Sequence, residues 1–353
     1  MSSTTDPQGN ELDPQGASRS LEVTGLGVVV IGRNEGERLR RCLLSLTAMQ
    51  GAIAYVDSGS TDGSVELAAG LGAQVVELDM ALPFTAARAR NAGFEALLKA
   101  LPELRYVQFV DGDCEVVAGW LEAAVAALDS APDVAVVCGR RRERFPDRSV
   151  YTQLCDLEWD TPVGEAEACG GDALMRVDAF QRAKGYNPQL VAGEEPELCV
   201  RLRGLGYRVL RLPHEMTLHD ADMQRFSQWW KRTVRSGHAF AELAAMHGEG
   251  LSGPGVRSTL GNLAYGVALP LALGVATRLT PLAVGGWLAY PALYTRVVRG
   301  QLQRGRSPRE ANLYAAACTV GKLPEALGAL RFLYGAATGH RSGIMEYKGV
   351  AAR

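Results

Sequence analysis

From residue 27 onward, short apolar runs alternate with longer amphipathic segments. A continuous apolar run, typical of a strand that is covered on both faces, lies at 28–31, and further short strands are predicted at 53–56, 74–78, 106–110 and 134–137. Segments with apolar residues at helical spacing lie at 37–48, 65–69, 86–100 and 119–129. This alternation predicts an α/β fold with a mostly parallel, Rossmann-like sheet and helices on both faces. In such sheets, ligands bind beyond the carboxyl ends of the strands.

The pattern changes after Gln228. Two apolar segments, 262–279 and 281–298, are each interrupted by Gly and Pro. Both are close to the lower limit for crossing a bilayer, which takes about 20 residues. A buried helical hairpin in a soluble domain is one interpretation. We favour membrane contact, because arginines at the ends of these segments can meet anionic headgroups.

These patterns divide the chain into three parts. Residues 1–24 are polar, carry Pro and Gly and lack an apolar core, so we expect a disordered lead-in and not a signal peptide. Residues 25–235 are expected to form the α/β catalytic domain, and 236–353 a helical, membrane-associated extension. The seven cysteines include no CxxC pair, which favours a reducing compartment over a disulfide framework or a zinc site.

Charge is distributed unevenly along the chain. The totals of 37 Lys+Arg and 39 Asp+Glu nearly cancel, but acidic residues dominate before Gln228 and basic residues after it. The acidic part before Gln228 is suited to a site that binds cations. The basic, apolar part after it is suited to contact with an anionic membrane surface. We therefore expect a cytoplasmic protein on the inner face of the cell membrane, with no nucleic acid as a partner.

Two groups of polar residues follow predicted strands. Asp111-Gly112-Asp113 comes directly after the strand at 106–110, and paired carboxylates there suit Mg²⁺ or Mn²⁺ with coordination positions left for phosphate oxygens. A solvated acidic turn is the alternative. Asp57 ends the second strand and can either accept a hydrogen bond from a base or close a turn. A dinucleotide fingerprint after the first strand and a P-loop are both missing from the sequence.

Five segments in order give the sequence a recognisable identity. They read VVVIGRNEGERLRRCLLSL, YVDSGSTDGS, ARARNAG, FVDGDC and AGEEPELCVRLRGLGYRV. Together they resemble family-two glycosyltransferases, which are nucleotide-sugar-dependent enzymes with a GT-A fold, here of the inverting type found in bacterial polysaccharide and glycolipid synthesis. The resemblance covers about 27–235. It implies a nucleotide pocket lined by Asn34 and Glu35, a base-reading Asp57, an Arg90 that approaches the diphosphate, and a metal-binding pair, Asp111 and Asp113.

The resemblance also implies a catalytic base. In the family, a Glu-Asp pair opens a helix and its second acid deprotonates the acceptor hydroxyl. Here Glu194 and Glu195 occupy the two positions, so Glu replaces the usual Asp and either residue can be the base. Carboxylates at this position also favour the N-terminus of a helix, whatever their chemical role.

Further residues are assigned through the same resemblance. His219 matches a histidine that related enzymes place on the metal or diphosphate, although His214 lies nearby. Asp172, after a Gly-Gly pair, is expected on the acceptor side. Trp229 and Trp230 lie in a partial match to the QxxRW signature of processive synthases, and either offer a stacking surface for an acceptor or pack an amphipathic helix. The arginine-rich run 140–144 is either a solvated face or a site for an acceptor phosphate.

The combined prediction is an inverting glycosyltransferase. It would move a sugar from a nucleotide-diphosphate donor, expected to be a UDP-sugar, to a hydroxyl of a saccharide or lipid-linked glycan by one in-line displacement with a metal-bound leaving group. A nucleotidyltransferase is the first alternative, but it would need a glycine-rich phosphate loop with a lysine that 32–36 does not provide. A catalytically inactive sugar-nucleotide-binding protein is the second.

Overall fold

The computed structural model describes residues 25–47, 49 and 52–339, so the lead-in expected at 1–24 lies outside the described residues. Within them, nine strands form one sheet in the order β3-β2-β1-β4-β8-β6-β9-β5, with β7 beside β9. The strands are β1 (Leu26–Gly32), β2 (Ile53–Asp57), β3 (Gln74–Glu77), β4 (Tyr106–Asp111), β5 (Cys114–Val116), β6 (Val134–Glu143), β7 (Gly164–Ala166), β8 (Ala173–Arg176) and β9 (Arg208–His219).

Most of the sheet is parallel, as predicted. Strands β1 to β4, β6 and β9 run in one direction, and β5, β7 and β8 run in the other. Because β4, β6 and β9 share a direction, their carboxyl ends lie at the same edge of the sheet. The strand β6 extends to Glu143, beyond the end predicted at residue 137, so most of the arginine-rich run is part of the sheet.

Helices cover both faces of the sheet. They are α1 (Glu37–Leu44), α2 (Ser64–Gly70), α3 (Ala86–Ala100), α4 (Trp120–Ser130), α6 (Val177–Arg182) and α7 (Glu194–Gly204). Helix α3 packs closely on β1, since a Cβ added at Gly93 would lie 2.5 Å from Cγ1 of Val29. Successive side chains of a strand point to opposite faces, and Val28 and Val30 are also fully buried, so both faces of β1 are covered.

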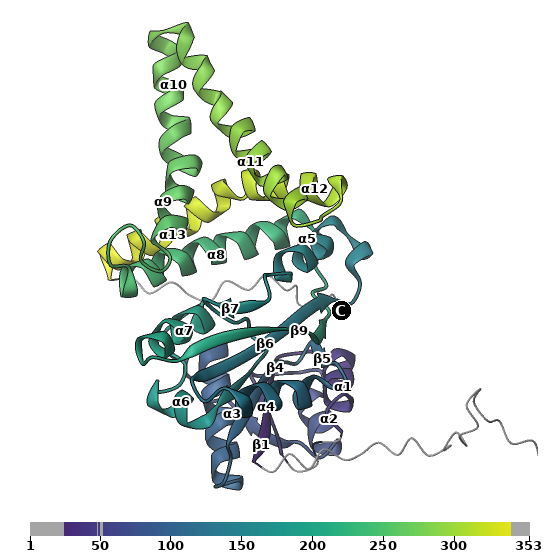
Figure 1. The fold of residues 1–353 in the computed structure, drawn as a ribbon. Coiled ribbons are helices and arrows are strands. Elements are labelled where there is room, and N and C mark those ends of the chain that lie inside the picture. The colour runs from purple at the N-terminus through teal and green to yellow at the C-terminus, as the bar shows by residue number, and fades with distance from the viewer. Residues whose placement is uncertain (1–24, 48, 50–51, 340–353) are drawn as a thin grey trace, which may run out of the picture.

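A layer of helices separates the sheet from the rest of the chain (Figure 1). It contains α5 (Val150–Trp159), which follows a short 3₁₀ turn, η1 (Pro146–Arg148), together with α8 (Phe226–His247), α12 (Pro308–Val320) and α13 (Lys322–Thr338). A second small core, which includes Leu154, Met223 and Trp229, joins α5 to α8. The domain boundary placed at residue 235 falls inside α8.

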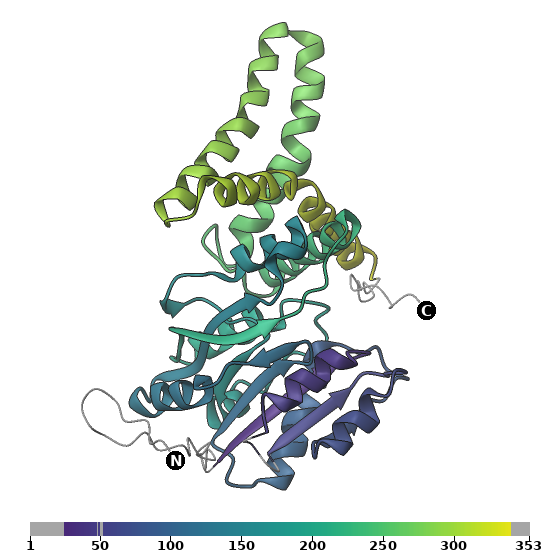
Figure 2. The ribbon, with the colours of Figure 1, turned by 90° about the vertical axis from the view of Figure 1, so that its right-hand side faces the viewer.

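Beyond this layer, a helical hairpin projects away from the sheet (Figures 1 and 2). One arm contains α9 (Val256–Leu263), the π-helical η2 (Ala264–Ala268) and α10 (Leu269–Leu279); the other contains the 3₁₀-helical η3 (Pro281–Leu288) and α11 (Ala289–Gln303). Among the described residues, one helical run, Val256–Leu279, is long and apolar enough to cross a membrane by length and composition alone. The second apolar segment, 281–298, is divided between η3 and α11 and does not form such a run.

Candidate active site at the carboxyl edge of the sheet

Asp111 ends β4 at the centre of the site, between two arginines. Its carboxylate pairs with Nη2 of Arg90 at 2.8 Å and with Nη2 of Arg141 at 2.8 Å. Burial raises the pKa of Asp111, but the two guanidinium groups outweigh this effect and bring the pKa to about 2. Asp111 is therefore held as a carboxylate.

Asp172 holds the backbone of Asp111 in place through a hydrogen bond. It is fully buried just before β8, and its Oδ1 accepts a hydrogen bond from the backbone amide of Asp111 at 3.0 Å. Its Oδ2 accepts from Nε of Arg141 at 2.8 Å and from the Thr217 hydroxyl at 2.6 Å. These contacts fix the end of β4 and orient Arg141, and they leave the carboxylate without exposed surface.

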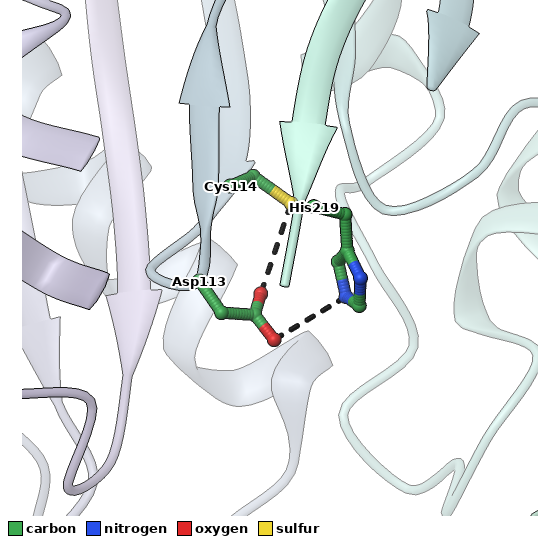
Figure 3. Close-up of side chains that lie close together, drawn as sticks. All are labelled: Asp113, Cys114 and His219. Atoms are coloured by element: carbon green, nitrogen blue, oxygen red, sulfur yellow. Dashed lines mark hydrogen bonds and ion pairs between the residues drawn. The ribbon is translucent and has the colours of Figure 1, made fainter. Parts of the chain in front are cut away.

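Asp113, the second carboxylate of the Asp-Gly-Asp triplet, lies beside His219 (Figure 3). The pair forms because β5 and β9 are antiparallel with Cys114 opposite His219. His219 Nε2 lies 3.3 Å from Asp113 Oδ2, and its Nδ1 lies 3.5 Å from Glu143 Oε2 at the end of β6. Burial lowers the pKa of His219, but the two carboxylates outweigh it and leave the pKa raised. The structure thus brings together Asp113 and His219, two of the three residues expected to bind a metal, and their role as ligands stays a prediction.

The residues around Asp113 fit a divalent cation. Ligand atoms of Asp113, Cys114 and His219 lie within 4.8 Å of one another, and those of Asp111, Cys114 and Asp172 form an adjoining group. Burial raises the pKa of the Cys114 thiol well above its usual range when no cation is bound, whereas a carboxylate and a neutral imidazole can ligate without first losing a proton. Carboxylate and imidazole therefore dominate the donor set, a combination compatible with Mn²⁺.

Glu194 and Glu195 reach the same site from the first turn of α7. Each places an Oε1 atom 2.9 Å from Nη1 of Arg90, the guanidinium that also holds Asp111. Burial and the charge of Glu194 raise the pKa of Glu195 to about 7, against the opposing effect of Arg90. The Glu195 side chain is 14% exposed and that of Glu194 is 6% exposed, so Glu195 is the more accessible of the two.

Arg90 differs from its expected role. The resemblance placed it beside the donor diphosphate, but its side chain is 2% exposed and bound to three carboxylates, with its guanidinium 5.4 Å from the ring centre of Tyr186. In this arrangement Arg90 links α3 to β4 and α7, and it orients the carboxylates of Asp111, Glu194 and Glu195. Its pKa is raised, because these acids outweigh the effect of burial.

The loops after β1 and β2 form a second part of the site. Asp57 Oδ2 accepts hydrogen bonds from the amides of Gly59 and Ser60 at 2.8 and 2.7 Å, and Oδ1 accepts from the Tyr55 hydroxyl at 3.0 Å. Asn34 joins the two loops. Its backbone amide donates a hydrogen bond to Ser60 Oγ, and its side-chain Oδ1 accepts one from the backbone amide of Thr61. Asp57 thus closes its own turn, which was the alternative to base reading. Glu35, in the same region, pairs with Arg38 at 2.9 Å.

The tryptophan pair is not an open stacking surface. Trp229 is buried in the small core between α5 and α8, and Trp230 is partly buried against the same core. The expected acceptor role is therefore corrected for Trp229, because its ring has little surface left for a ligand. The amphipathic interpretation of this helix agrees with the packing.

Three residues of the site were missed or misread from the sequence. Arg141 was read as part of a solvated or phosphate-binding run, but it pairs with Asp111 and Asp172 inside the sheet. Glu143 supports His219, and Trp159, at the end of α5, lies edge-on against the His219 ring with centroids 4.6 Å apart. The sequence carries no alternating signal that β6 extends this far, because 134–139 are all apolar or small and 140–143 are all charged.

Comparisons with known proteins find a family for part of the chain. Residues 27–181 match the family model described as glycosyl transferase family 2. A pre-mycofactocin glycosyltransferase of Mycobacterium tuberculosis is 27% identical over 233 residues, which cover 62% of this chain and 47% of that protein. The chain thus spans about half the length of this relative. The succinoglycan biosynthesis protein ExoA of Rhizobium meliloti is 24% identical over 291 residues, which cover 77% of this chain and 85% of that protein.

A solved structure shows the same fold. The mannosyltransferase PcManGT from Pyrobaculum calidifontis, solved in complex with GDP-Man and Mn²⁺, superposes with a TM-score of 0.54 at 19% identity. The superposition covers 88% of this chain and 87% of that chain, and this likeness concerns the GT-A-type fold. The family match, the named relatives and the fold together show that residues 27–181 of this chain form a glycosyl transferase family 2 domain.

Proposed function

We propose that this glycosyltransferase is inverting and transfers a sugar from a nucleotide-diphosphate donor to a hydroxyl of a saccharide or lipid-linked glycan. One observation carries the proposal. The guanidinium of Arg90 forms ion pairs with Glu194 and Glu195 of α7 and with Asp111 at the end of β4, although these acids are far apart in the sequence. An acceptor-side base and a donor-side carboxylate therefore belong to one site.

Glu195 is the base in this proposal. It is the more exposed member of the pair, and a pKa of about 7 gives it useful proton affinity at neutral pH. A carboxylate in this position can take the proton of the acceptor hydroxyl as the oxygen attacks the anomeric carbon, while the bond to the donor diphosphate breaks. Arg90, Glu194 and Asp172 act as positioning residues.

Asn34, Glu35 and Asp57 form the nucleotide side of the proposed site. They lie in the loops after β1 and β2, at the sheet edge where ligands of open α/β folds bind. We expect a UDP-sugar, from the resemblance of the sequence. GDP-mannose is the second donor to examine, because the structurally similar mannosyltransferase was solved with it.

A divalent cation, Mn²⁺ or Mg²⁺, is proposed to bind at Asp113 and His219, with Asp111 beside them. Such a cation would neutralise the charge that develops on the departing diphosphate. Asp111 already pairs with Arg90 and Arg141, so these arginines share the task of balancing negative charge at the site.

We place the enzyme at the cytosolic face of a membrane. The hairpin that projects from the catalytic domain carries exposed apolar side chains at its tip, such as Leu279 and Leu282, the latter 89% exposed. The C-terminal region that contains it is basic, which favours contact with anionic lipids. A polysaccharide biosynthesis protein among the relatives is consistent with this placement.

The test is a donor screen with the full-length protein. A panel of UDP- and GDP-sugars is tested for thermal stabilisation and for donor turnover, with Mn²⁺ and with EDTA. We expect stabilisation by one nucleotide class and turnover that needs the metal, and we expect Asp113→Asn to lose metal-dependent turnover while it remains folded. Equal turnover in Mn²⁺ and in EDTA would contradict the metal assignment.

A further inference from the structure

Four arginines converge where the sheet meets the helical region. Arg140 comes from β6, Arg211 from β9, and Arg304 and Arg306 from the turn after α11. They surround Asp160, the residue that directly follows α5. We call these four side chains the Asp160 arginine cluster.

The cluster carries more positive charge than the carboxylates that contact it carry negative charge. Asp160 Oδ1 lies 3.5 Å from Nε of Arg140 and 3.7 Å from Nη2 of Arg211, while Oδ2 pairs with Arg306. Arg304 donates to the backbone carbonyl of Asp160 at 3.3 Å. Within the described part of the chain, Asp156, which pairs with Arg140, is the other carboxylate in contact with these guanidinium groups. Four positive charges thus contact two carboxylates, and Glu310 is a third acid near Arg306.

Arg211 shows the imbalance most clearly. Its side chain is 4% exposed, and its Nε and Nη1 atoms are buried without a hydrogen-bond partner in the described chain. Burial lowers the pKa of Arg211, and the like charge of Arg140 lowers it further. A buried guanidinium with unused donors is unfavourable unless an anion binds it, and its planar fork matches the oxygens of a phosphate.

The position of the cluster connects it to the active site. Asp160 directly follows Trp159, whose ring packs on His219 and lies 5.3 Å from the Arg141 guanidinium. Arg304 and Arg306 follow the arm of the hairpin that we place at the membrane. A group bound here would therefore lie between the reacting residues and the hairpin.

We propose that the Asp160 arginine cluster binds the phosphate of a phosphate ester, and that the acceptor is linked to such a phosphate. The statement about the acceptor rests on the proposed glycosyltransfer to a saccharide or lipid-linked acceptor. The statement that the cluster binds a phosphate does not depend on that function. The same chemistry is offered by the phosphate of a lipid-linked acceptor and by a phospholipid headgroup. Asp160 occupies part of the site as an internal anion and competes with either ligand.

The test measures phosphate binding by the full-length protein in detergent. Inorganic phosphate and a short prenyl phosphate are titrated by calorimetry into the wild type and into Arg211→Gln, Arg306→Gln and Asp160→Asn. Each arginine variant should bind phosphate at least about 10-fold more weakly, and Asp160→Asn should bind it more tightly because the competing anion is removed. Arg309→Gln, at an exposed arginine of α12 outside the cluster, is the matched control and should bind as the wild type does.

Further measurements distinguish a lipid-linked acceptor from a phospholipid headgroup as the source of the phosphate. They also distinguish failure of the phosphate-binding proposal from failure of the proposed function. Vesicles that contain phosphatidylglycerol are compared with prenyl phosphate; the ligand whose binding is lost in Arg306→Gln identifies the source. Binding of the nucleotide sugar with Mn²⁺, measured in every variant, reports folding and the donor site separately. Phosphate affinity that is equal in the wild type and in both Arg306→Gln and Asp160→Asn would overturn the inference even if Arg211→Gln fails to fold. Absence of sugar transfer with phosphate binding intact would instead overturn the proposed function.

Discussion

Three carboxylates share one buried guanidinium at Arg90, and this contact sets the protonation of the site. A buried cation stays charged when neighbouring acids compensate for its lost hydration. The effect is unequal, since Asp111 is drawn to a low pKa by two arginines and Glu195 is left with a raised one. Two carboxylates of one site are thereby suited to different tasks.

Replacing the base separates binding from chemistry. Glu195→Gln keeps the volume of the side chain and loses its ability to accept a proton, so transfer to the acceptor should fall by about 100-fold or more. Donor affinity, measured by calorimetry, should be retained. A fully active Glu195→Gln together with an inactive Glu194→Gln would assign the base to Glu194.

The pH dependence of transfer follows from the raised pKa of Glu195. The base acts when ionised, so kcat/KM should rise with pH and level off above about 7. The charges that face Glu195 come from Arg90 on α3, Glu194 on α7 and Asp111 on β4. Because the charge of Glu194 raises this pKa, Glu194→Gln should stay active and move the inflection to lower pH. An inflection that does not move would contradict the electrostatic assignment.

At the scale of elements, the close crossing of α8 and α13 fixes the helical layer. A Cβ added at Gly328 would lie 2.0 Å from the carbonyl oxygen of Val234, and one added at Gly237 would lie 2.0 Å from that of Glu325. These contacts involve backbone atoms, which cannot move aside as a flexible side chain can. Small residues are therefore required at both positions.

Gly328→Ala should accordingly destabilise the protein. Overpacking at this crossing should lower the free energy of unfolding by about 3 kcal/mol, measured by denaturant titration in detergent. Gly261→Ala in α9 is the matched control, because a Cβ there meets nothing within 4 Å. The control should be neutral, or stabilising by up to about 1 kcal/mol through helix propensity. Similar behaviour of the two variants would mean that the crossing tolerates a larger separation.

For the whole molecule, the proposed role of the hairpin is to hold the catalytic domain at a membrane. Its exposed leucines would be unfavourable in water, and their burial in lipid would stabilise a membrane-bound position of the enzyme. The Arg-rich base of the hairpin would then lie at headgroup level. In this proposal the acceptor is carried by the same membrane to which the hairpin binds.

Charged substitutions at the tip should release the protein from membranes. The full-length double variant Leu282→Glu with Leu288→Glu should sediment with anionic liposomes much less than the wild type does, because two buried carboxylates oppose insertion. Leu205→Glu, at an exposed leucine of the catalytic domain, is the control and should sediment as the wild type does. High salt should not release the wild type if the tip is inserted. Unchanged sedimentation of the double variant would show that the tip is not the membrane contact.

The sequence by itself determined the local elements and the types of acid in the site. The strands, the Asp-Gly-Asp triplet after β4 and the Glu pair at the start of α7 follow from hydrophobic periodicity and from neighbours along the chain. The mixture of directions in the sheet was less visible, because β5 and β7 have three residues each and carry little periodic signal.

Only the tertiary structure decided which of these residues meet. Arg141 joined Asp111 because β6 extends past residue 137, His219 met Asp113 and Glu143 through the pairing of β9 with β5 and β6, and Trp229 was buried by α5. Each of these outcomes depends on strand register and on packing between segments far apart in the chain. Such contacts are selected by the summed burial and hydrogen bonding of the whole fold, which no local stretch of sequence contains.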